Sequence, residues 1–150
     1  MVYFRLALFA VTCMTVGACS TDRALAPPVV SLDSASLRLV ASLSRDFQPI
    51  SPPDGKPLIA GFRVFTVDGA LIPSTLRADS AWIYNGAEVW GSSVTEEQSR
   101  SAGASYFEVV ARNGPMWGPG IAVDVMLQLR DAAGHAVLLQ APRVLVVRTD

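Results

Sequence analysis

The feature that most constrains the fold is a segment in which aliphatic residues alternate with smaller or polar ones. From Ile121 to Leu129 every second residue is Ile, Val or Leu, whereas Asp124 and Gln128 are among the residues between them. Successive side chains of a β-strand point to opposite faces, so this pattern predicts a strand with one buried face and one wet face. Other strands of the chain must then cover the aliphatic face.

Period-two patterns recur along much of the chain. We expect strands at 37–43, 58–67, 81–84, 87–90, 106–112, 121–130, 135–140 and 143–149. Proline cannot donate to a strand ladder, so the proline-rich range 45–57 is predicted to be a loop. The range 91–105 is rich in serine and is predicted to be a mobile loop, and 113–120 is interrupted by Gly and Pro.

Short strands separated by Gly and Pro turns, with no amphipathic helix, favour an all-β domain at 35–150. About seven or eight strands in this length suggest a two-sheet antiparallel β-sandwich, similar to immunoglobulin-like domains. A small β-barrel is the alternative.

One hairpin is predicted locally. Asn85-Gly86 suits a two-residue type I′ turn between segments of high strand propensity. That turn would place Trp82, Tyr84 and Val89 on one uncharged face, which we expect to be buried. The predicted core combines Leu37, Phe62, Trp82 and Phe107 with the 121–129 stripe.

The N-terminal segment has the three parts of a secretory signal. Arg5 supplies a positive charge, the run from Leu6 to Val16 is uncharged, and Gly17 and Ala18 are small. A membrane-spanning helix needs roughly 20 apolar residues, so this run is too short for a permanent span. Together with Cys19, Val16-Gly17-Ala18 resembles the lipobox of bacterial lipoproteins, in which the cysteine is acylated before cleavage.

The resemblance implies a signal peptide at 1–18 and an acylated Cys19 that anchors the mature chain in a lipid bilayer. Ser20 follows the cysteine, and by similarity to enterobacterial sorting this favours the outer membrane. The alternative is ordinary secretion, which would leave Cys19 as an exposed thiol. Residues 19–34 contain Pro27-Pro28 and are predicted to form a flexible tether, although 29–32 is also suited to an edge strand.

Charge and composition narrow the function classes. The chain has 12 Lys and Arg against 13 Asp and Glu, and this balance argues against nucleic acid as a partner. Cys13 lies within the signal, so with Cys19 acylated no thiol remains for a disulfide, a metal site or a nucleophile. We therefore expect no cofactor and no metal.

Side chains that carry catalysis are sparse and scattered. His135 is the single histidine, and Asp131 is its nearest carboxylate in sequence. Glu96-Glu97 lie in a predicted loop. Solvated surface charge is a commoner role for such carboxylates than a glycosidase pair. The acidic residues of three turns, Asp54, Asp68 and Asp131, are interpreted as turn formers rather than calcium ligands. We expect the chain not to be an enzyme.

The aromatic residues are the better candidates for binding. Trp117 lies in the 113–120 loop with Asn113 and Met116, and Trp90 is expected on the partly exposed face of its hairpin. Trp117 is either a platform for a ligand or a plug that seals the domain. The predicted function is a non-enzymatic binding or assembly module at the cell envelope, with a protein or glycan partner. The alternative is a small envelope hydrolase, or an inhibitor of one, acting on peptide or glycan.

Overall fold

The computed structural model describes residues 26–150. The predicted signal peptide at 1–18, the predicted acylation site Cys19 and the first part of the predicted tether, up to residue 25, lie outside the described residues. In the described part of the chain, no helix is long and apolar enough to cross a membrane.

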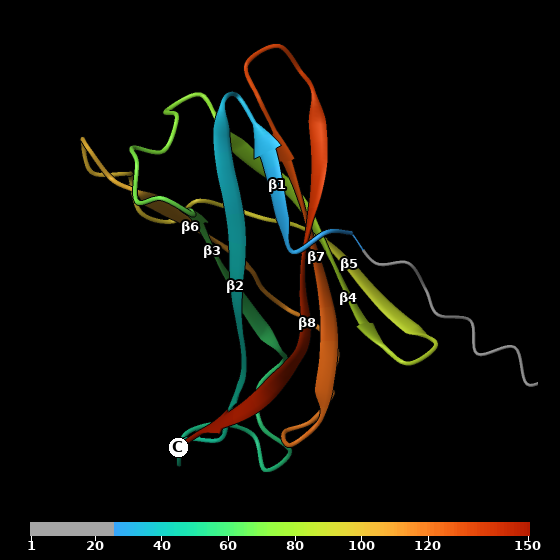
Figure 1. Ribbon diagram of the computed structural model, residues 1–150. Helices are drawn as coiled ribbons and strands as arrows, with labels where there is room; N and C mark the ends of the chain where they lie inside the picture. The colour runs from blue at the N-terminus through green and yellow to red at the C-terminus, as the bar shows by residue number, and fades with distance from the viewer. Residues whose placement is uncertain (1–25) are drawn as a thin grey trace, which may run out of the picture.

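The described residues form eight strands and confirm the all-β class (Figure 1). The strands are β1 (Val29–Leu32), β2 (Ala35–Asp46), β3 (Ile59–Thr66), β4 (Arg77–Asn85), β5 (Glu88–Ser93), β6 (Tyr106–Ala111), β7 (Ala122–Arg130) and β8 (Ala136–Thr149). The alternative of an edge strand at 29–32 corresponds to β1, which pairs antiparallel with β2.

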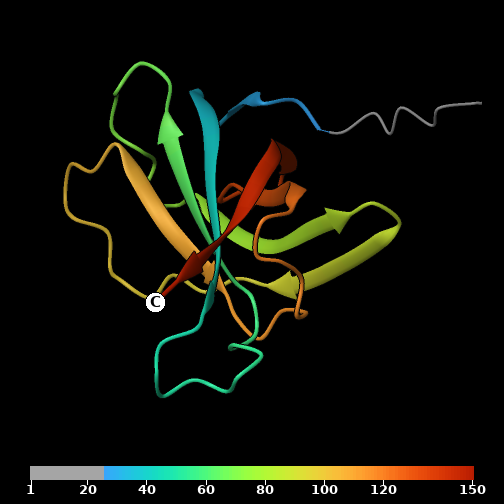
Figure 2. The ribbon, with the colours of Figure 1, turned by 90° about the horizontal axis from the view of Figure 1, so that it is seen from below.

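The predicted two-sheet sandwich is wrong. Seven strands follow one another in a single mixed sheet of order β5-β4-β7-β8-β2-β3-β6, with β1 added beside β2. The sheet curls into a half-barrel, and Figure 2 shows β8 crossing from the β7 side to the β2 side. Because β8 hydrogen-bonds to both neighbours, the two groups of strands are continuous and do not form separate layers.

The bend in β8 explains this continuity. Residues 136–145 pair antiparallel with β7, and Val146 to Thr149 pair parallel with β2. Near the junction the pairing shifts, because Pro142 and Arg143 lie opposite Asp124 alone. Arg143 has a φ of 54°, and its N–H donates to the Asp124 carboxylate at 2.9 Å. Such a bulge bends a strand, so two segments predicted as separate strands form one strand of 14 residues.

The core lies on the concave face of the half-barrel and contains most of the predicted residues. Leu37, Phe62 and Phe107 are at most 2% exposed. The alternating segment of β7 also places its aliphatic face inward, through Val123, Val125, Leu127 and Leu129. Ile121 packs against this cluster from the preceding loop and is only partly buried. The period-two pattern therefore identified the buried faces of β2, β6 and β7, and the predicted core residue Phe62 is buried in β3.

The predicted face of the β4–β5 hairpin is wrong. Asn85 pairs with Glu88 and Ile83 with Trp90, so the turn residues are Gly86 and Ala87. Gly86 has a φ of 59°, as the first turn residue of a type II′ hairpin requires. The shift leaves the same residues together on each face, but the inner face is the one with Ile83 and Trp90, whereas Trp82 is only partly buried and Val89 is 47% exposed.

Candidate functional site

The predicted surface residues Trp90, Trp117 and Asn113 lie around one shallow depression of about 520 Å³, which we call the aromatic groove. Its lining residues come from β5 and from the loop after β6: Glu88, Val89, Trp90, Gly91, Asn113, Gly114, Pro115 and Trp117. Both tryptophans are half-buried and also pack against the core. Trp117 therefore lines the groove, as expected of a platform, and packs against the core, as expected of a plug.

Trp90 is positioned by contact with a glycine. A Cβ atom on Gly114 would lie 2.6 Å from Cζ3 of Trp90, so a larger residue there would displace the ring. The Gly114 N–H donates to the carbonyl of Leu58 at 2.9 Å, which holds the loop against the sheet. Asn113 precedes it with a φ of 61°, a backbone conformation that asparagine tolerates better than most residues.

The 113–120 loop is held from beneath by Arg45, the largest polar side chain among the buried residues described. Arg45 is 4% exposed, and its Nη1 donates to the carbonyls of Met116 at 3.1 Å and Gly118 at 2.9 Å. Its Nε donates to the carbonyl of Lys56 at 3.0 Å, and Nη2 donates to that of Asp54. One guanidinium thus joins the 47–58 loop to the wall of the aromatic groove.

The fourth predicted surface residue, Met116, serves this anchor instead of lining the groove. Besides its carbonyl, its sulfur lies 3.4 Å from Arg45 Nη2. Its side chain is 45% exposed, so it contributes apolar surface beside the loop. Met116 therefore has a different role from the other three predicted residues, which line the groove.

The two edge strands of the half-barrel, β5 and β6, meet at only one described point. Thr95, just after β5, exchanges backbone hydrogen bonds of 3.0 and 2.9 Å with Val110 of β6. Beside this bridge, Arg112 donates to Glu97 at 2.7 and 2.8 Å. Its hydrogen bonds lower the pKa of the Glu97 carboxyl, so this ion pair holds down to lower pH than an isolated glutamate would allow.

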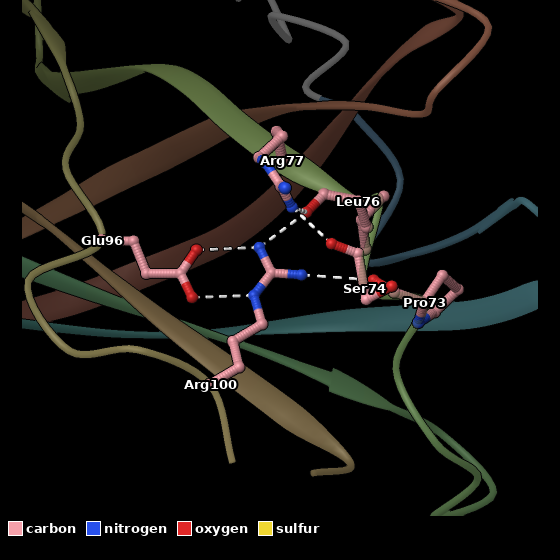
Figure 3. A network of polar contacts seen from close by, with 6 residues as sticks. All are labelled: Pro73, Ser74, Leu76, Arg77, Glu96 and Arg100. Carbon is pink, nitrogen blue, oxygen red and sulfur yellow. Dashed lines mark hydrogen bonds and ion pairs between the residues drawn. The ribbon is translucent and has the colours of Figure 1, made fainter. Parts of the chain in front are cut away.

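The serine-rich loop predicted at 91–105 begins within β5 and is anchored by Arg100 (Figure 3). Arg100 donates to both carboxylate oxygens of Glu96, at 2.8 and 2.9 Å, and to the carbonyls of Pro73 and Leu76. Its guanidinium also lies 3.9 Å from the centre of the Phe107 ring. Of this loop region only Gly91 lines the aromatic groove.

The scattered polar candidates have local structural roles. The Asp131 carboxylate accepts from the His135 N–H at 2.8 Å and lies 2.9 Å from its Nδ1. Desolvation acts to raise the pKa of Asp131, but these hydrogen bonds outweigh it and lower the pKa. The pair caps the turn between β7 and β8 and does not line the aromatic groove. Within residues 26–150 no cluster of three or more His, Cys, Asp or Glu is placed to hold a metal.

The proline-rich range 45–57 predicts a loop that begins at Arg45, whereas Arg45 lies in β2. A signal was present, because Arg45 continues the alternation of Leu37, Leu39, Ala41 and Leu43 onto the inner face. Val89 and Glu88 also line the groove without a signal in the sequence, because the lack of charge on its face of the hairpin predicts Val89 to be in the core. Among the groove-lining residues, all in the described range, Glu88 alone is charged.

Comparisons with known proteins give no relative for this chain. No family model, no curated protein and no solved structure matches it.

Replacing Arg45 by alanine should lower the free energy of unfolding by about 3 kcal/mol or more, because several buried carbonyls lose a charged donor. Arg45→Lys should not restore stability, since an ammonium cannot reproduce the planar set of donors. Arg38→Ala, on the exposed face of the same strand, is the control. Urea unfolding measures all three variants, and equal losses for Arg45→Ala and Arg38→Ala would contradict the anchoring role.

Proposed function

We propose that the chain is a lipid-anchored protein of the cell envelope whose half-barrel is a non-enzymatic binding module. The aromatic groove is its binding surface. The observation that supports binding is the convergence of Trp90 and Trp117, from distant parts of the chain, on one accessible depression. Half-buried aromatic rings offer a large contact area at low conformational cost, and they are enriched where proteins bind ligands.

The construction of the groove supports the same proposal. Its volume of about 520 Å³ lies within the range of ligand sites, about 300–1,000 Å³. Arg45 fixes the loop that carries Trp117, and Gly114 fixes the Trp90 ring. A preformed wall reduces the ordering cost of binding. The groove lining contains one carboxylate, whereas glycoside hydrolysis normally uses two.

The cellular address in this proposal rests on Val16-Gly17-Ala18-Cys19. More than one acyl chain gives stable anchoring, since each buried methylene contributes about 0.8 kcal/mol.

Metabolic labelling of the full chain with a fatty-acid analogue tests the address. The wild type should incorporate the label, and Cys19→Ala should not, because the acylated thiol is gone. Cys13→Ala is the matched control and should label normally. Labelling that survives in Cys19→Ala would contradict acylation at this residue.

Binding is tested by screening the full chain against two probes, a displayed library of random octapeptides and a panel of oligosaccharides. Trp117→Ala should lower the affinity for the ligands found in the screen by about tenfold or more. It should cost only about 2 kcal/mol of unfolding free energy, because the ring is half-buried. Tyr106→Ala, an exposed aromatic on β6, should bind normally.

Ligand affinities that Trp117→Ala leaves unchanged, combined with a clear loss of stability, would contradict the binding role. Trp117 would then be a plug of the open half-barrel. Failure of both probes to yield any ligand would count against the binding module as a whole.

A further inference from the structure

The aromatic groove runs beside an unpaired edge of the sheet. In the β4–β5 hairpin, Asn85–Glu88 and Ile83–Trp90 are pairs that exchange hydrogen bonds, because pairs alternate outward from a two-residue turn. The backbone N–H and C=O groups of the intervening Val89 and Gly91 therefore point away from β4. Within residues 26–150 these four groups have no hydrogen-bond partner, and we call them the free edge of β5.

Farther along the chain, outward-pointing backbone groups of the same alternation have hydrogen-bond partners. Two and four residues beyond Gly91 lie Ser93 and Thr95, and Thr95 uses its outward groups to bond Val110 of β6. Beyond this bridge the Gly114 N–H donates to the carbonyl of Leu58, on the β3 side, and not to β5. The aromatic groove lies here, between β5 and the 113–120 loop, beside Val89 and Gly91.

Natural sheets usually protect an edge with proline, lysine, a bulge or a covering segment. β5 contains neither proline nor lysine, and it pairs with β4 without a shift in register. At the opposite edge, β6 is bonded at Val110, and residues 98–105 lie alongside it. Of the two end strands, β5 is therefore the one that can accept another strand.

We propose that the aromatic groove binds an extended segment of a partner protein, which adds to the sheet as a strand along β5. This inference rests on the proposed function and specifies the chemistry of its ligand. The backbone of the segment would exchange hydrogen bonds with Val89 and Gly91, and its alternate apolar side chains would contact the tryptophans. Glu88 lies at the end of the groove near the hairpin turn, so a Lys or Arg of the segment belongs there.

The test uses octapeptides selected from the displayed library on the full chain, each resynthesised in two N-methylated forms. One form carries the methyl groups on odd positions and the other on even positions. Only one of the two sets faces β5 in an added strand, so one form should lose affinity about tenfold and the other should bind nearly normally. Equal effects of the two forms would overturn strand addition.

A protein variant gives an independent test. Val89→Pro removes one outward N–H and leaves the β4–β5 ladder intact, because that N–H does not bond β4. It should lower the affinity for the same peptides about tenfold, whereas Val89→Thr, which keeps the N–H, should bind them normally. If Val89→Pro does not fold, the N-methylated peptides alone decide the question.

The other outcomes separate this inference from the proposed function. Oligosaccharides that bind in a Trp117-dependent manner, without any peptide ligand, would sustain the binding module and overturn strand addition. Peptides that bind Val89→Pro and the wild type equally would likewise sustain the binding module and overturn strand addition. A concentration-dependent dimer that is lost in Val89→Pro, without any peptide ligand, would identify the occupant of the edge as a second copy and also overturn the proposal.

Discussion

The bulge in β8 is the constraint on which the architecture depends. Pro142 has no N–H to donate, and Arg143 adopts a left-handed conformation that a carboxylate of the neighbouring strand stabilises through its N–H. This local arrangement bends β8, which pairs with β7 again at Val144 and Leu145 and then pairs with β2 in parallel from Val146 onward. Without that bend, the strands on either side of β8 would have no reason to share one sheet.

The strands at the two ends of the curled sheet, β5 and β6, differ in how their backbone edges are covered. The edge of β6 is bonded to Thr95 and flanked by the Glu97–Arg112 ion pair. The edge of β5 lies beside a groove whose far wall is the 113–120 loop. Arg45 holds that loop from the core side, so buried contacts maintain the shape of the groove.

Much of the fold could be predicted from the sequence, because burial on one face of a strand leaves a period-two pattern. The buried faces of β2, β6 and β7 follow it. The closure of the sheet could not be predicted in this way, since a proline between two apolar segments equally suggests a loop or a bulge. The site was predicted in part: Trp90, Trp117 and Asn113 meet at the groove, but the uncharged face of the hairpin that carries Val89 was expected to be buried.

β5 has a free backbone edge beside the aromatic groove, so the N–H groups of adjacent residues in this strand alternate between free and hydrogen-bonded. Native-state amide hydrogen exchange, followed by NMR on the full chain, distinguishes the two classes. The N–H groups of Val89 and Gly91 should exchange rapidly, whereas those of Trp90 and Ser92, which bond β4, should be protected. Protection of Val89 and Gly91 equal to that of Trp90 would contradict the free edge.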